Sequence, residues 1–317
     1  MTAGSFASYY NDVIQRVSLL VVQGSDTHER VGGVYALTEL IDFRGDDAGQ
    51  KTTRFASYLR AVLRGNDLTA IIVAAQALGR LAAPGGTLTA ELVEAEVKNA
   101  LEYLQTERQE ARRFAAVCTL RELARNSPTL MYQWVPQIFE VIWVALRDQQ
   151  VMIRESAAET VSACFEIIAA RDSQMRQQWF SRVYEEALRG FQLNTVNAIH
   201  GSLLTIRELL RKGAMFMNQR YKEACEVVLR YKDHRENLIR REVIGILPVL
   251  ATYAPVEFAN NYLHQCMLYL QGLIKGSKER SAAFDAVGHI ATAVGSSIAP
   301  YLDGILTYIR EGLTMRA

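Results

Sequence analysis

Apolar residues recur along the chain with the spacing of one helix face, most clearly over residues 112–124, which read RRFAAVCTLRELA. Side chains three and four positions apart in an α-helix lie on the same side, so this segment predicts a helix with one buried stripe. The predicted stripe consists of small and branched apolar residues: Ala116, Val117, Leu120, Leu123 and Ala124. Three polar residues are expected to turn away from it toward solvent: Arg112, Thr119 and Glu122.

The same pattern returns about every 41 residues. With Leu120 as the reference, equivalent apolar positions follow one another at intervals of 41, 42, 41, 45, 41 and 40 residues. These reference positions are Leu37, Leu78, Leu120, Val161, Ile206, Leu247 and Val287. In five of the seven copies an arginine stands seven positions earlier: Arg30, Arg113, Arg154, Arg240 and Arg280. We expect the seven reference residues to be buried at equivalent positions of seven helices.

A period near 41 that contains two helices is typical of HEAT and armadillo repeats, whose units span about 40 to 47 residues. The sequence therefore predicts an all-α fold, a single α-α superhelix of the HEAT/armadillo solenoid type with about seven and a half helical-hairpin repeats. The predicted repeats are residues 5–42, 51–83, 88–126, 128–170, 173–211, 216–252, 255–294 and a half repeat at 298–317. Because the half repeat leaves an apolar helix without a partner, we expect the chain to be a fragment of a longer protein.

Four residues and one long interval predict details of this array. Pro136 should stand in the first turn of a fresh helix, and Pro248 should kink its helix or end the regular hydrogen bonding. Asp148 and Arg154 are six residues apart, a spacing at which HEAT arrays place an acid and a base that pair between adjacent units. The interval of 45 indicates that the fifth repeat carries extra residues between positions 171 and 179.

Composition and charge exclude several classes of protein. The chain of 317 residues has a formal net charge of +1, whereas a dedicated nucleic-acid-binding domain is usually basic. Its longest apolar run, residues 244–256, contains two prolines and is shorter than a membrane span, and no segment near Met1 resembles a signal peptide. The four cysteines are far apart and form no CxxC pair, so we expect reduced thiols in the core.

Short matches to catalytic motifs lack the residues that the chemistry requires. Residues 42–44 (DFR) and 234–236 (HRE) resemble kinase triplets, but the chain has no glycine-rich phosphate loop. His28 and Glu29 resemble the His-Glu pairs with which HEAT-like iron hydroxylases bind metal, but only this repeat carries such a pair. We therefore predict no catalytic, cofactor-binding or metal-binding residue in this segment.

Beyond the repeat itself, longer strings carry a family resemblance. They include RFASYLRAVL at 54–63, LTAELVEAEVKNALEYL at 88–104, RRFAAVCTLRELARNSPT at 112–129 and IHGSLLTIRELLR at 199–211. Over essentially the whole chain, the sequence resembles the N-terminal HEAT solenoid of the TOR serine/threonine kinases, members of the phosphatidylinositol-kinase-related family. One departure is the short link at 212–216, where animal members carry a long insertion.

The resemblance implies a non-catalytic scaffold that assembles the TOR complex and carries regulatory contacts in nutrient and growth signalling. The implied partners are a Raptor-like armadillo subunit, a Rheb-like small GTPase and a second TOR protomer, with no nucleic acid and no insertion into membranes. ATP and Mg belong to a kinase domain that is absent here. The implied location is the cytoplasm, with peripheral attachment to lysosomal or vacuolar membranes through the complex. The alternatives are an independent HEAT adaptor, of the phosphatase-scaffold or transport-receptor kind, and an enzyme using His28 and Glu29.

In that family a GTPase docks on early helices, which correspond here to the first repeat. Five polar residues of this repeat lie off its apolar stripe and are therefore candidates for partner binding: Asp12, Gln15, Arg16, Asp26 and Glu29. The competing interpretation is that they form an ordinary solvated surface.

Overall fold

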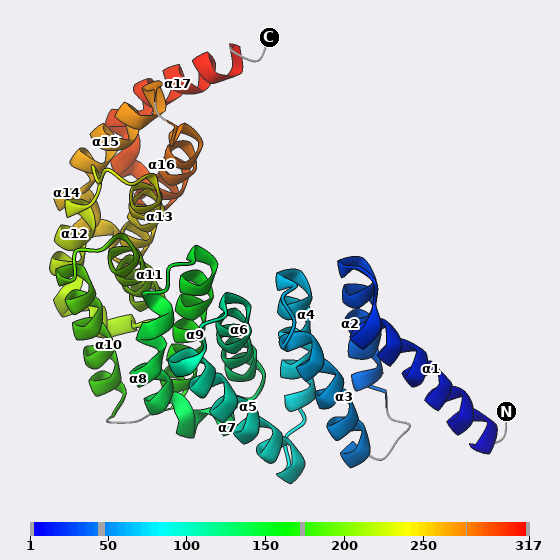
Figure 1. Ribbon diagram of the computed structural model, residues 1–317. Coiled ribbons are helices and arrows are strands. Elements are labelled where there is room, and N and C mark those ends of the chain that lie inside the picture. The colour runs from blue at the N-terminus through cyan, green and yellow to red at the C-terminus, as the bar shows by residue number, and fades with distance from the viewer. Residues whose placement is uncertain (1–2, 44–47, 172–174, 277, 315–317) are drawn as a thin grey trace. The chain divides into compact units, whose positions relative to one another are not determined.

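The structure, a computed structural model, describes residues 3–43, 48–171, 175–276 and 278–314. Every regular element within these ranges is a helix, and none is a strand (Figure 1). The chain forms two compact units, Met1–Trp179 and Phe180–Ala317, with the boundary inside helix α10 (Met175–Gln192).

In the first unit, long helices alternate between two layers along the chain. One layer holds the first helix of each repeat, and the other holds the second helices, which pack side by side in chain order. The first helices are α1 (Ala3–Gln23), α3 (Ala48–Leu63), α5 (Thr87–Thr106) and α8 (Val135–Leu146). The second helices are α2 (Thr27–Ile41), α4 (Leu68–Ala82), α6 (Glu110–Asn126) and α9 (Val151–Ala169). Two short elements precede α8: α7 (Pro128–Met131) and the 3-10 helix η1 (Tyr132–Trp134).

The second unit continues the alternation. Its second helices, which contact one another in chain order, are α11 (Val196–Lys212), α13 (Asn237–Tyr253) and α16 (Arg280–Val294). Its remaining long helices are α12 (Tyr221–Arg230), α15 (Leu263–Gly276) and α17 (Leu302–Thr314). Three short elements join them: the 3-10 helices η2 (Ala214–Arg220) and η3 (Gly295–Tyr301), and α14 (Pro255–Asn261).

All seven reference residues of the repeat pattern are buried, and the most exposed of them, Val287, exposes only 3% of its surface. Each lies on a second helix, from Leu37 on α2 to Val287 on α16. The prediction of equivalent buried positions is therefore confirmed. The physical reason is that each second helix packs against the second helix of a neighbouring repeat. All of them except α11 are also seen to pack against the first helix of their own repeat: α2, α4, α6, α9, α13 and α16.

The arginine of the repeat pattern closes the turn between the two helices of its own repeat. Arg154 is almost fully buried, and its Nη1 donates to the backbone carbonyls of Asp148 (2.6 Å) and Gln149 (3.0 Å). Arg240 makes the same pair of contacts at the same spacing, 2.8 Å to each carbonyl. Arg113 donates to the carbonyl five residues before it. A charged donor thus satisfies carbonyls at which the backbone leaves its helical pattern, which explains why this position favours arginine.

The predicted pairing of the Asp148 and Arg154 side chains is wrong. The Asp148 carboxylate instead accepts hydrogen bonds from Arg113 of the preceding repeat, at 2.7 Å from Nε and 3.3 Å from Nη2. This bond raises the pKa of Arg113 above its usual value, against the opposing effect of burial. Arg240 donates in the same way to Glu279 of the following repeat. The ion pairs therefore do join adjacent repeats. Arg113 and Arg240 each contact a carbonyl of their own turn and also an acid of the following repeat.

The two prolines behave differently. Pro136 stands in the first turn of α8, as predicted, where its missing N–H has no helical partner to lose. Pro248 lies inside α13, which continues to Tyr253, so this proline does not end the helix. The extra residues predicted between 171 and 179 fall partly on 172–174, outside the described residues.

Candidate functional site

The predicted partner-binding residues fall into two groups in the structure. Asp12, Gln15 and Arg16 are exposed on α1. Asp26 and Glu29 are exposed as well, but they form the cap at the start of α2. The Asp26 side chain accepts a hydrogen bond from the Glu29 N–H (2.9 Å), and the Glu29 carboxylate accepts from the backbone N–H of Ser25 (2.7 Å). Such caps contribute about 1 kcal/mol, so Asp26 and Glu29 already have a structural use.

The exposed residues of α1 line up along one side of the helix. Asp12, Gln15 and Arg16 are followed at helical spacing by Leu19 and Val22, which expose 47% and 45% of their surface, and preceded by Tyr9, at 61%. We call these six residues the α1 stripe. Exposed aromatic and aliphatic side chains with polar residues beside them occur at protein interfaces. Their role in binding a partner stays a prediction.

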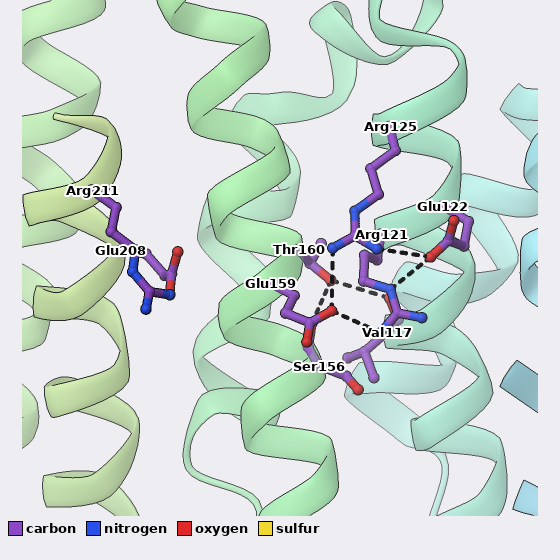
Figure 2. A network of polar contacts seen from close by, with 9 residues as sticks. All are labelled: Val117, Arg121, Glu122, Arg125, Ser156, Glu159, Thr160, Glu208 and Arg211. Atoms are coloured by element: carbon purple, nitrogen blue, oxygen red, sulfur yellow. Dashed lines mark hydrogen bonds and ion pairs between the residues drawn. The ribbon is translucent and has the colours of Figure 1, made fainter. Parts of the chain in front are cut away.

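A second polar arrangement lies between the second helices α6 and α9 (Figure 2). Arg121 donates to Glu122 (2.8 Å) and to Glu159 (3.0 Å), and Arg125 donates to the same two carboxylates, at 3.1 and 3.2 Å. Two arginines from α6, one acid from α6 and one acid from α9 therefore form a closed ring of four alternating charges. Beside it, the Thr160 hydroxyl lies 3.1 Å from the carbonyl of Val117 and joins the two helices.

The predicted exposure of Thr119 and Glu122 is therefore wrong. Their exposed fractions are 4% and 6%, although Arg112 is partly exposed. The prediction treated α6 as a helix with a single buried stripe, but α6 packs against α4, α5 and α9 and is covered on three sides. A glutamate in this position is tolerated because two arginines surround its carboxylate.

The second unit contains a similar arrangement with three of these four contacts. Arg207 donates to Glu208 (3.0 Å) and to Glu242 of α13 (2.7 Å), and Arg211 donates to Glu208 (3.0 Å). The signal for both arrangements was present in the sequence as TLRELAR at 119–125 and TIRELLR at 205–211, each containing Arg-Glu-x-x-Arg next to a reference residue. Pairing of these residues with the following repeat was not predicted.

In both of these charge rings, the closed one and the one with three contacts, the arginines and glutamates are paired with one another. The buried glutamate of each ring has a side chain exposed by only 6 to 8%, and its carboxylate already accepts two arginines. Such a group has little capacity left for a ligand, and its geometry fixes the position of one second helix against the next. The rings therefore hold the repeats in register.

The described residues contain no group of three or more His, Cys, Asp or Glu side chains that could hold a metal ion. His28 is exposed, and its neighbour Glu29 is engaged in the cap of α2. In the described part of the chain, no single helix has the length and apolarity of a membrane span. One strongly bent pair, α13 with α14, reaches this length and apolarity when its two helices are counted together.

The four cysteines are buried free thiols. Burial raises the pKa of Cys118 to about 11 and those of Cys164, Cys225 and Cys266 to about 12, from an ordinary value of 9.0. A raised thiol pKa means that the folded chain keeps protons which the unfolded chain releases at high pH. Stability from these groups is therefore complete below about pH 9 and is lost as the pH rises toward 11 to 12.

We expect the urea midpoint of unfolding to be steady from about pH 7 to 8 and to fall progressively above about pH 9. The double variant Cys118→Ala/Cys164→Ala should show a shallower fall. It should not abolish the fall, because Cys225 and Cys266 remain. Burial also raises the pKa of Tyr262 and Tyr269 to about 12. An identical slope in the variant and the parent chain would contradict the assignment to these thiols.

The chain is similar to long protein kinases over its whole length. Serine/threonine-protein kinase tor1 of Schizosaccharomyces pombe is 40% identical over 316 residues, covering 100% of this chain and 14% of the relative. Serine/threonine-protein kinase TOR of Arabidopsis thaliana is 37% identical over 298 residues, covering 93% and 12%. TOR2 of Saccharomyces cerevisiae is 36% identical over 330 residues, covering 99% and 13%. The chain thus spans about an eighth of these relatives, and it does not contain their kinase domain.

Solved structures establish the fold. Yeast importin-beta (Kap95p) superimposes with a TM-score of 0.61 at 16% identity, covering 96% of this chain and 37% of that chain. A Kap121p mutant superimposes with a TM-score of 0.58 at 11% identity, covering 96% and 32%. No protein-family model matches the sequence. The fold is thus the predicted HEAT/armadillo-type solenoid, and the chain is homologous over its whole length to a HEAT-repeat segment of the TOR serine/threonine protein kinases.

Proposed function

We propose that this chain is a non-catalytic scaffold segment of a TOR-type serine/threonine kinase, which helps to assemble the kinase complex and carries its regulatory protein contacts in nutrient and growth signalling. The observation that carries the proposal is the 40% identity over 316 residues with a TOR kinase. In this proposal catalysis, ATP and Mg belong to a kinase domain elsewhere in the parent protein, and the segment itself binds no cofactor.

The proposed partners are proteins: a Raptor-like armadillo subunit, a Rheb-like small GTPase and a second TOR protomer. A repeat array suits such contacts because each added repeat adds surface without changing the packing of distant repeats. The proposed location is the cytoplasm, with peripheral attachment to lysosomal or vacuolar membranes through the complex.

The α1 stripe is the proposed contact for the GTPase. Its support is that Asp12 and Arg16 are exposed and that no hydrogen bond or ion pair engages their side chains within the described residues. Asp26 and Glu29 remain candidates of the same proposal, but their cap makes them poor positions for a test, since charge reversal there would also destabilise α2.

We expect the double variant Asp12→Lys/Arg16→Glu, placed in the full-length kinase, to weaken GTPase-stimulated activity by roughly tenfold, since like charges facing each other at an interface are unfavourable. Basal kinase activity and the melting temperature of the 317-residue chain should stay unchanged, because both side chains are exposed. Stimulation equal to that of the parent kinase would show that the α1 stripe is only a solvated surface.

The matched control is Lys222→Glu/Glu226→Lys, a charge swap at the same spacing on the exposed face of α12. It should leave GTPase stimulation intact. If both double variants reduce stimulation equally, the effect is not specific to the first repeat.

An independent HEAT adaptor of the phosphatase-scaffold or transport-receptor kind is the second candidate. The observation in its favour is the superposition on importin structures, but identities of 11 to 16% speak to the fold alone.

A further inference from the structure

A groove of about 1190 Å³ lies on the layer of second helices in the second unit. It is lined by residues of α13 and α16 along its length and by the last turn of α11 at one end. On α13 the lining extends from Arg241 to Thr252. The helical rise over this segment is roughly 17 Å, or about three turns. This volume exceeds the range of about 300 to 1,000 Å³ for small-molecule pockets, which favours a polypeptide segment as its occupant.

Small residues line the groove on both helices. They are Gly245 on α13 and Ala282 and Ala286 on α16. A Cβ placed on Gly245 would meet no atom within 4 Å, so a side chain there would enter open space. Ile244 and Pro248 complete an apolar lining. Parallel helices with small residues between them leave a channel into which the apolar face of a third helix can pack.

The charges around the groove are mostly basic. Arg241 lies at one end, Arg211 and Lys212 lie at the other, and Asp285 is the one carboxylate in the lining. Arg211 forms an ion pair with Glu208. Arg241 is exposed and has no hydrogen bond or ion pair within the described residues. Positive charge at both ends of an apolar channel complements a helix that carries carboxylates at both of its ends.

We propose that this groove is a docking site for an amphipathic helix of about three turns from a partner protein, with apolar residues on the face that enters the groove and acidic residues near both ends. The site deepens the proposed scaffold role by naming the chemistry of one partner segment. It does not depend on which protein of the complex supplies that segment.

The test measures fluorescence anisotropy of a labelled 14-residue peptide with leucines at helical spacing and glutamates at both ends, titrated with the 317-residue chain. A second peptide carries lysines in place of the glutamates. We expect the acidic peptide to bind at least roughly tenfold more tightly than the basic one. The variant Gly245→Trp should weaken binding of the acidic peptide by at least tenfold, and Arg241→Glu should remove or reverse the preference between the two peptides.

Gly288→Trp is the matched control, because Gly288 is also an exposed glycine of a second helix with open space around its Cβ position, but it does not line the groove. It should bind the acidic peptide like the parent chain. Both substitutions replace glycine in a helix interior, so neither is expected to reduce helix stability.

Three results would overturn the proposal: no binding of the acidic peptide at about 1 mM, equal affinity of the Gly245→Trp variant and the parent chain, or equal affinity of the two peptides. Sedimentation of the same samples covers another occupant, since a dimer of the chain that Gly245→Trp dissociates would mean that a second copy fills the groove. None of these results bears on the scaffold role, which is tested separately by GTPase stimulation of the full-length kinase.

Discussion

Replacing Glu122 with alanine is expected to lower the free energy of unfolding by about 3 kcal/mol. Glu122 is buried, and its carboxylate accepts from Arg121 and Arg125. Its removal leaves the Arg121 guanidinium, itself only 9% exposed, with Glu159 as its remaining carboxylate. Breaking a buried ion pair by removing one partner typically costs about 3 to 5 kcal/mol, and the value here lies at the low end because Glu159 stays. Urea denaturation of the purified chain measures it.

Glu159→Ala is the matched control for this prediction. It removes a carboxylate from the same ring, but one with a side chain 48% exposed, so the loss should stay within about 1 kcal/mol. Glu122→Gln should fall between the two, since the amide keeps the volume and one acceptor. If Glu122→Ala changes stability by less than about 0.5 kcal/mol, the residue is a surface glutamate, as helix-face reasoning from the sequence suggested.

Replacing Leu120 with alanine is expected to cost about 2 to 5 kcal/mol. Leu120 is fully buried, and it lies on α6, the helix that packs against α4, α5 and α9. The truncation therefore removes buried methyl groups and leaves a cavity that three neighbouring helices cannot readily close. The upper half of the range applies if the repeats are held rigidly in register by the charge rings.

Leu88→Ala is the control, because it is the same substitution in the same unit at a side chain 50% exposed. It should stay within about 0.5 kcal/mol of the parent chain. Equal losses for Leu120 and Leu88 in urea melts would show that the reference positions of the repeat do not mark the buried seam.

The repeat pattern was readable from the sequence because burial at Leu37, Leu120 and Val287 follows from one simple geometry, a helix pair stacked on its neighbours. Glu122 was misassigned because the periodicity of one helix reports how wide its apolar stripe is, and it cannot report how many helices surround it. A charged residue at the edge of that stripe is exposed if one neighbour is present and buried if three are present.

The contacts of the repeated arginine also could not be predicted from the sequence. Its period was visible, but Arg154 acts on backbone carbonyls of its own turn, and the position of a carbonyl depends on loop conformation. In the first repeat, the exposure of Asp12 and Arg16 was predictable. The role of Glu29 in the cap of α2 was not, because it depends on a hydrogen bond from the backbone N–H of Ser25 that only the structure shows. The groove at Gly245 depends on what faces the glycine across two helices, and the sequence does not record this.

The central proposal is that these 317 residues act as a scaffold segment of a TOR-type kinase rather than as a free-standing adaptor. An immunoblot of cell extract, with an antibody raised against the 317-residue chain, tests it most directly. Because the chain spans 14% of the fission-yeast relative, the proposal predicts a single polypeptide roughly seven times longer than this chain, which also yields kinase-domain peptides by mass spectrometry. A band at 35.6 kDa without kinase-domain peptides would contradict it and favour the independent adaptor.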